Sequence, residues 1–344
     1  MVNQRIVKKQ SGVALVPVLL ITALVAALAI EFHYDFMLNM SRVGNRWSGA
    51  QAHQYLLGAE SLAALVLEQD LENESDTDDL TEDWAQEVPP FPTDHGFLEA
   101  RIEDAQSRFN INNLRDKVDL DPSQPVVNDA QRFTAVQRFF IRLLQTFEGE
   151  EIEVTEQEAI AITEAIIDWL DEDDEVMGFG GAESLFYNSA DPSYQPGNQL
   201  MSSVSELRLV KNMTPELYVA LEPYLMALPG NTNLNVNTAP ARLFRAINDV
   251  EDLTPLEAVD VEDIVTDREL QPFDTINGFF ENPVVTGLMT NPDRLDANLG
   301  VASDFFILHA KASVGEDHIR FLDSVIYRND EGKARAYHRR YTSY

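Results

Sequence analysis

The sequence predicts an α+β protein in which a long N-terminal helix packs on a small antiparallel sheet that carries a large, inserted all-α domain. Three observations predict this arrangement. An apolar stretch near the N-terminus continues into a segment with helical spacing. Strand-like alternation occurs near residue 100 and again after residue 303, and helical patterns fill the interval. One sheet interrupted by a helical insertion is the most economical way to connect these segments.

The composition allows two or three domains with real hydrophobic cores. The chain has 344 residues, of which 44% are hydrophobic and 24% are charged. Its 25 Lys and Arg against 58 Asp and Glu give a formal net charge of −33. This charge disfavours nucleic acid and anionic lipid surfaces and suits calcium or basic partners, although solubility alone could explain most of it. The chain has no Cys, which excludes disulfides and thiol chemistry.

The first thirty residues predict a membrane-spanning helix. Residues 1–12 carry three basic side chains and no acid, and the eighteen residues 13–30 carry no charge. At about 1.5 Å per residue this stretch forms roughly 27 Å of helix, just enough to cross a hydrocarbon core. The basic flank is expected on the cytoplasmic side, so that the body faces outward.

Three interpretations of this segment are open. A secretory signal peptide would be cut at a small-x-small site such as Ala27–Ala29, which gives a mature chain starting at Ile30. An uncleaved anchor is the second interpretation. The third is the leader of a type IV pilin-like protein, which is cut after a Gly while the apolar helix is retained. The sequence around Gly12 and Val13 resembles that processing site.

The fifth position after this processing site distinguishes classes of pilin-like proteins. Most of them have a Glu there, whose carboxylate pairs with the charged amino terminus of the neighbouring subunit. Counted from Val13, the residue here is Pro17. This departure resembles the K-type pseudopilins, which lack the Glu and are thought to sit at the filament tip. Pro17 also bends a helix, and the two explanations are compatible.

An amphipathic helix and an acidic linker are expected after the span. The helix is expected to be irregular at residues 41–49, which contain two Gly. Its apolar stripe packs on the protein's own sheet or on neighbouring filament helices, with the sheet favoured for the later half. Residues 68–87 are strongly acidic and indicate a solvated linker. The stripe consists of Ala52, Tyr55, Leu56, Ala59, Leu62, Ala63, Val66 and Leu67.

The rest of the chain changes from strand to helix and back. Residues 97–111 alternate well enough for one or two strands, and residues 303–314, 318–328 and 333–342 predict three more, joined by short turns. Between them, helices are expected over residues 133–147 and 156–170, and others open at Thr214-Pro215 and Thr238-Ala239-Pro240 with Thr as the N-cap.

This layout resembles the K-type minor pseudopilin of type II secretion over nearly the whole chain. The resemblance implies a non-enzymatic protein at the tip of the pseudopilus, with a single inner-membrane span and a periplasmic body. It also implies processing by prepilin peptidase and partnership with I- and J-type minor pseudopilins through the N-terminal helix. Besides the leader, it rests on RFNINNL (108–114), IIDWLDEDDE (166–175), GAESLFY (181–187), SVSELRLVKNMTPELY (203–218), LPGNTNLNVNTAP (228–240) and the FFILHA…SVIYR ending.

A calcium site is predicted at the end of the second long helix of the insertion. Residues 168–175 contain six acids, which repel one another at a helix C-terminus that itself disfavours negative charge. A Ca²⁺ ion with oxygen ligands would compensate, and the resemblance adds that the K-type helical domain binds calcium. The alternative is a solvated acidic loop. The expected ligands are Asp168, Asp171, Asp173 and Glu183.

Patterns that would indicate DNA binding or catalysis are incomplete in this sequence. Residues 234–247 resemble the opening of a helix-hairpin-helix element, but the Gly hairpin that grips DNA is missing, so no nucleic acid partner is expected. Asn235 and Asn237 are instead expected to bond to local backbone groups. The Asn-x-Asn pattern of Asn110-Ile111-Asn112 recurs at Asn235-Val236-Asn237, which suggests two similar lobes. No nucleophile motif accompanies the six His, and an Asp-x-Asp pair without a phosphate loop does not make a glycosyltransferase.

Two alternative functions remain at this stage. A minor pilin-like tip protein of a type IV pilus shares the leader, and a secreted calcium-binding protein or hydrolase with an ordinary signal peptide shares the acidic composition. The basic cluster at residues 335–340 is expected to protect an edge strand rather than to meet an acidic partner. The predicted divisions are a leader (1–12), the N-terminal helix (13–72), the linker (73–96), first strands (97–112), the helical domain (113–300, lobes 113–205 and 206–300) and C-terminal strands (301–344).

Overall fold

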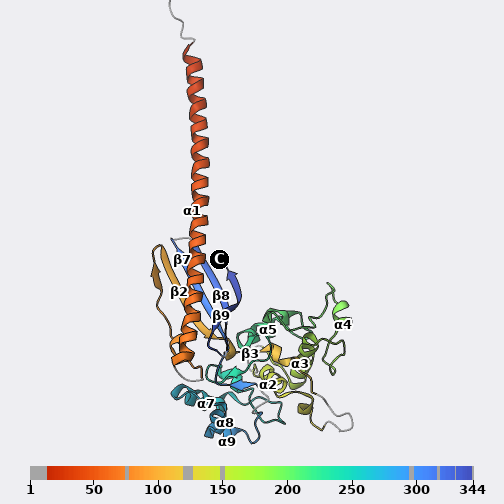
Figure 1. Cartoon of the computed structure of the whole chain (residues 1–344). Coiled ribbons are helices and arrows are strands. Elements are labelled where there is room, and N and C mark those ends of the chain that lie inside the picture. The colour runs from red at the N-terminus through yellow and green to blue at the C-terminus, as the bar shows by residue number, and fades with distance from the viewer. Residues whose placement is uncertain are drawn as a thin grey trace, which may run out of the picture.

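The computed structural model describes residues 14–73, 77–118, 127–147, 152–293, 298–315, 318–329 and 331–342. It consists of one long helix, α1 (Leu15–Asn73), a five-stranded sheet and a domain of short helices (Figure 1). The predicted fold class is confirmed. The processing site at Gly12 and Val13 lies outside the described residues. The sheet strands are β1 (Phe91–Thr93), β2 (Gly96–Asp104), β7 (Phe305–Val314), β8 (His318–Arg328) and β9 (Ala334–Thr342).

The remaining elements are short and belong to the inserted domain. Its α-helices are α2 (Ala135–Gln145), α3 (Glu156–Leu170), α4 (Ser184–Asn188), α5 (Pro215–Leu221), α6 (Ala241–Phe244), α7 (Ala258–Leu270), α8 (Ile276–Glu281) and α9 (Pro283–Leu288). Its strands are β3 (Phe109–Asn110), β4 (Leu225–Met226), β5 (Leu234–Asn235) and β6 (Leu299–Gly300).

The sheet is antiparallel throughout, with strand order β1-β2-β7-β8-β9. Strands β2 and β7 are neighbours, with Gly96 opposite Val314 and Asp104 opposite Phe306. About two hundred residues separate these strands in the sequence, and they form the helical domain. The insertion into a single sheet, as predicted, is therefore the observed topology.

The later half of α1 packs along the sheet, while its earlier part stands clear of the body (Figure 1). Every described residue from Ala14 to Arg46 is exposed. The predicted stripe is confirmed except at Leu62, which is 59% exposed. The stripe residues buried in this core are Ala52, Leu56, Ala59, Ala63 and Leu67, and they face Phe306, Leu308, Ala310, Ala312, Val314, Leu322 and Ile326.

The expected irregularity at residues 41–49 is wrong, because α1 is continuous through it. A Gly inside a helix costs only about 0.5–1 kcal/mol relative to Ala. Gly44 and Gly49 together cannot outweigh the propagation of a helix of 59 residues, which adds one hydrogen bond per residue.

The acidic segment after α1 is also more ordered than predicted. Asp78 and Trp84 are only 1% and 3% exposed, and Trp84 stacks edge-on against Phe306 at 5.2 Å between ring centroids. Strand β1 follows and adds an edge to the sheet. The prediction of a solvated linker is therefore wrong at Asp78 and Trp84, because burial of Trp84 holds the chain against the sheet there, whereas most of the other residues from 80 to 90 are exposed.

The helical domain has one continuous hydrophobic core that draws on both of its predicted lobes. The two halves nevertheless begin alike. Asn110 accepts a hydrogen bond from the Asn112 backbone N–H at 3.2 Å, and Asn235 accepts one from Asn237 at 2.9 Å. Strand β3 pairs in parallel with β4, and β5 with β6. The repeated Asn-x-Asn pattern thus marks a repeated turn within a shared core. Strand β3 belongs to this domain rather than to the main sheet.

Local caps explain where the longer helices begin. Thr134 and Thr155 form capping boxes at the starts of α2 and α3, and Thr214 caps α5 with Pro215 at its first position, as predicted. Thr238 does not cap a helix. Its hydroxyl donates to the buried Asp104 carboxylate, and α6 begins after Pro240.

A charged row crosses the sheet where β2, β7 and β8 run side by side. His309 on β7 lies 2.8 Å from Asp323 and 3.3 Å from Glu103, through its two ring nitrogens. The hydrogen bond to Glu103 is the main cause that raises the His309 pKa, and the same bond lowers the Glu103 pKa to about 2. When it is protonated, His309 therefore links three strands.

Replacement His309→Gln is expected to destabilise the protein mainly between about pH 4.5 and 6.5, where the imidazolium and both carboxylates are charged. Because the folded-state pKa of His309 is raised, its contribution is complete below the unfolded value and fades as the pH rises above it. The measurement is the Tm of both proteins from pH 5 to pH 9. A Tm difference that stays constant over this range would contradict the charged role of His309.

Candidate functional site

The predicted acidic site forms where α3 ends and α4 begins. Asp168 lies on the last turn of α3, Asp171 is the residue after that helix, and Glu183 directly precedes α4. Each offers a carboxylate oxygen, and these oxygens all lie within 4.8 Å of one another. All three residues are buried, with exposed fractions of 0%, 6% and 3%. The chain turn through residues 172–182 thus folds back to bring three of the four predicted ligands together.

Three glycines allow this turn to lie directly against α3. A Cβ at Gly180 would stand 2.2 Å from the Ala161 Cα, and one at Gly181 would stand 2.3 Å from an Asp168 carboxylate oxygen. Gly178 has a φ of +58°, a conformation that other residues rarely adopt. The backbone is therefore held close to the helix that supplies Asp168.

Hydrogen bonds to helix carboxylates fix the same turn. The Met177 N–H donates to Asp168 at 3.0 Å, and the Gly180 N–H donates to Glu164 at 2.7 Å. Arg132 pairs with Glu164 and neutralises it. Both Asp168 oxygens accept from the Met177 N–H, so the turn is tied directly to a residue that lines the acidic site.

Two of the three buried carboxylates, Asp168 and Glu183, make no ion pair within the described residues. Both Glu183 carboxylate oxygens lack a hydrogen-bond partner within the part of the chain that the structure describes. Burial, followed by repulsion from Asp168 and Asp171, raises the Glu183 pKa to about 7. Burial is also the main cause that raises the Asp168 pKa to about 6. Unpaired buried carboxylates are costly, so this site is suited to a cation.

Asp173 lies outside the cluster. Its side chain is 51% exposed and pairs with Lys117 at 3.0 Å, while the same ammonium group lies 2.8 Å from Asp171. The structure thus separates the two residues of the Asp-x-Asp pair: one faces the buried oxygens and the other faces solvent. Lys117 offsets one of the three clustered charges and leaves Asp168 and Glu183 without a basic partner in direct contact among the described residues.

The donor set fits a hard divalent cation. Three carboxylates from two chain segments supply oxygen ligands, which Ca²⁺ prefers, and the chain offers no sulfur ligand from Cys. A site of this kind would need further oxygens from water or backbone to reach the six to eight that Ca²⁺ takes.

The exposed N-terminal part of α1 is a second candidate functional surface. Helix α1 contains a candidate membrane span near the N-terminus, and none of its most apolar window is buried inside the body. The exposed apolar residues continue beyond the span to Trp47, which is 56% exposed. An exposed face of this length requires either lipid or other helices as its surroundings.

Comparison with known proteins then identifies the family. A protein named "Type II secretion system protein K" from Aeromonas hydrophila is 32% identical over 336 residues, which cover 95% of each chain. The chain belongs to the type II secretion system protein K family. Relatives of the same name from Klebsiella pneumoniae and Pseudomonas aeruginosa are 34% and 32% identical, covering 80% and 95% of this chain and 81% and 91% of theirs.

Two further comparisons concern parts of the fold. Residues 107–230 match the family described as "Type II secretion system (T2SS), protein K". This range holds the whole acidic site. A chain in the crystal structure of the GspK-GspI-GspJ complex from enterotoxigenic Escherichia coli matches with a TM-score of 0.70 and 24% identity, covering 88% of this chain and 100% of that one. Family membership and fold thus agree with the resemblance predicted from the sequence.

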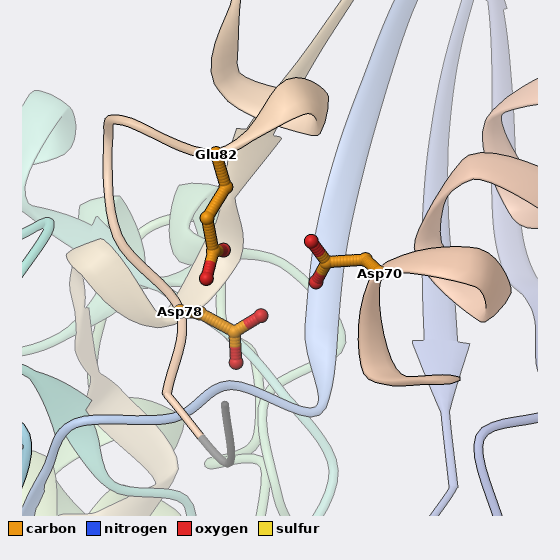
Figure 2. Close-up of side chains that lie close together, drawn as sticks. All are labelled: Asp70, Asp78 and Glu82. Carbon is orange, nitrogen blue, oxygen red and sulfur yellow. The ribbon is translucent and has the colours of Figure 1, made fainter. Parts of the chain in front are cut away.

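A second acidic cluster in this protein K family member was not predicted. Figure 2 shows Asp70 at the end of α1 pointing toward Asp78 and Glu82 on the following loop. Arg328 on β8 lies 3.0 Å from Asp70 and 2.6 Å from Asp78, and the Trp84 ring N–H donates to Glu82. Arg328 and Trp84 therefore already bind all three carboxylates, so this cluster is a structural junction rather than a metal site.

The junction was missed because its residues lie in a segment whose acidic composition is typical of a solvated linker. Burial raises the pKa of Asp78, with Arg328 acting against that shift, and burial raises the pKa of Glu82 to about 7. The only sequence signal was Trp84, an aromatic residue within an otherwise acidic run.

Replacement Arg328→Met is expected to destabilise the body by about 3–5 kcal/mol, because it leaves Asp78 buried without its cation. The measurement is thermal unfolding of the detergent-solubilised full chain by near-ultraviolet circular dichroism. Arg101→Met is the matched control: Arg101 also pairs with a carboxylate, but its side chain is 65% exposed, and its loss should cost less than about 1 kcal/mol. Equal Tm values for the two variants would contradict the role of the junction.

Proposed function

We propose that this chain is a minor pseudopilin at the tip of the type II secretion pseudopilus, where it helps to initiate and cap the filament. The observation that carries the proposal is the shape of the molecule (Figure 1). The exposed apolar part of α1 extends from one end of the sheet, and the helical domain lies toward the other end, partly beside the sheet and partly beyond it. If α1 packs into a helical filament core, the helical domain lies above it, where another subunit would have to add.

The role is architectural and not enzymatic. The N-terminal helix would anchor the chain in the inner membrane, with a cytoplasmic N-terminus and a periplasmic body, as the basic flank favours. Prepilin peptidase would cut between Gly12 and Val13. Pro17 in place of the usual Glu supports the tip position, because a subunit at the end has no later neighbour whose amino terminus needs a carboxylate.

The expected partners are I- and J-type minor pseudopilins. Support comes from the Escherichia coli relative, whose structure was solved as a GspK-GspI-GspJ complex. In this chain the unburied face of α1, from Leu15 to Trp47, provides the apolar surface for helix-to-helix packing.

Deletion of this chain is expected to abolish secretion through the type II system, and an epitope-tagged copy should restore it. In immunogold microscopy of sheared pseudopili, label is expected at one end of each filament, because the helical domain blocks further addition. Label along the shaft would contradict the tip position. Loss of surface filaments with intact secretion would instead favour a type IV pilus protein.

The N-terminal residue of the mature protein is the control for this experiment. A start at Val13 in the membrane fraction is expected of a processed pseudopilin. A start at Ile30 in the soluble fraction would instead indicate a secreted calcium-binding protein and would overturn the filament role.

We also propose that Ca²⁺ binds at Asp168, Asp171 and Glu183 as a structural ion. The support is the pair of unpartnered, buried Glu183 oxygens beside two further buried carboxylates. The ion would offset their mutual repulsion and hold the start of α4 against the end of α3. Exported modules bind Ca²⁺ at about 10⁻⁴–10⁻³ M, so a site with only three carboxylates is sufficient.

Added Ca²⁺ is expected to raise the Tm of the EGTA-treated chain, with about 2.7 kcal/mol of stabilisation when its concentration reaches 100 times Kd. Glu183→Gln should remove this Tm shift, because it deletes one of the ligands that no protein group neutralises. Asp173→Asn, whose side chain faces solvent, should keep it. The idea fails if the wild-type chain shows no Ca²⁺-dependent shift, or if Glu183→Gln shifts as much as the wild type.

A further inference from the structure

One short segment of the helical domain concentrates exposed apolar side chains. In residues 176–186, here called the apolar tip segment, Val176 is 57% exposed, Phe179 103%, Leu185 88% and Phe186 43%. Elsewhere in the described part of this domain, large exposed apolar residues occur singly, as at Val219 (66%). Single exposed apolar residues are ordinary on protein surfaces, whereas four within eleven residues concentrate exposed apolar side chains in one short segment.

The segment is ordered although its side chains are exposed. Phe179 stands between Gly178 and Gly180, and Gly180 donates its N–H to Glu164 at 2.7 Å. The Gly181 carbonyl accepts a hydrogen bond from Lys211 at 2.9 Å, and the same ammonium lies 5.1 Å from the centre of the Phe186 ring. A fixed backbone that presents an aromatic side chain loses little conformational freedom on binding, which favours affinity.

The charge beside the segment restricts what can cover it. Residues 172–175 are four consecutive acids, all exposed. Arg115 and Lys117 pair with Glu172 and Asp173, and within the described residues Asp174 and Glu175 make no ion pair. The chain as a whole carries −33, so a second copy and an anionic lipid surface are both repelled.

We propose that the apolar tip segment docks into a protein partner that presents an apolar cleft bordered by Lys or Arg side chains. Phe179 and Leu185 would fill the cleft, and Asp174 and Glu175 would face its basic rim. The segment belongs to the helical domain and lies far from the exposed part of α1 (Figure 1), so the contact is separate from assembly of the filament.

The test places the photoreactive amino acid p-benzoyl-phenylalanine at position 179 of the full chain in secreting cells. After irradiation, a protein adduct identified by mass spectrometry is expected, with its cross-linked residues in an apolar cleft that has basic neighbours. The matched control carries the same probe at Val219 and should not form this adduct. An adduct with a second copy of this chain or with lipid, or no adduct above the control, would overturn the proposal.

The identified partner is then purified for binding measurements. Phe179→Asp is expected to weaken its binding at least 10-fold, and Asp174→Lys combined with Glu175→Lys should weaken binding and reduce its salt dependence. Val219→Asp should bind as the wild type does. Both sets of changes lie on the surface, so normal Tm values and normal labelling of filament ends are expected and would separate failure of docking from failure of assembly. Unchanged affinity in Phe179→Asp would overturn the proposal.

Discussion

The ion pair between Arg328 and Asp78 connects parts of the chain that lie far apart in the sequence. The Arg328 guanidinium group also donates a hydrogen bond to the Ser303 carbonyl at 3.0 Å, and the Ser303 N–H donates to Asp78 at 2.7 Å. The Ser303 hydroxyl donates to the fully buried Asp104, which also receives a hydrogen bond from Asn235. One polar network thus joins the end of α1, the sheet and the helical domain. Because each member is buried, loss of one leaves others without partners, and the position of the helical domain relative to the membrane helix depends on it.

The sequence was sufficient for elements whose signal is local. Periodicity predicted α3 and the three C-terminal strands closely, and Thr214 caps its helix as predicted. Elements that depend on distant partners were not predictable. Asp78 lies in a run of acids that is typical of a solvated segment, and only the fold brings Arg328 to it from 250 residues away. Thr238 similarly bonds to Asp104 instead of capping a helix, a choice that depends on a residue 134 positions earlier.

The acidic site was likewise predictable only where it depends on residues that are close together in the sequence. The density of carboxylates after α3 was visible in the sequence, as was the return of Glu183 after the glycines. The sequence could not distinguish Asp171 from Asp173, because both lie in the same turn. Only the fold separates them: Lys117 pairs with both, but Asp171 is buried beside Asp168 and Glu183, whereas the Asp173 side chain is 51% exposed. Burial of Glu183 likewise follows from the close approach of Gly180 and Gly181 to α3.

That close approach also links the acidic site to the apolar tip segment. Asp168 faces Glu183 within the site and at the same time accepts the Met177 N–H that fixes the start of the turn. Glu164, one turn earlier on α3, fixes the next part of the turn through Gly180. Phe179 lies between these two anchors. A cation that reduces the repulsion between Asp168 and Glu183 would therefore also favour the backbone conformation that presents Phe179. The two surfaces share one helix, so the stability of the acidic site and the orientation of the exposed aromatic ring are expected to change together.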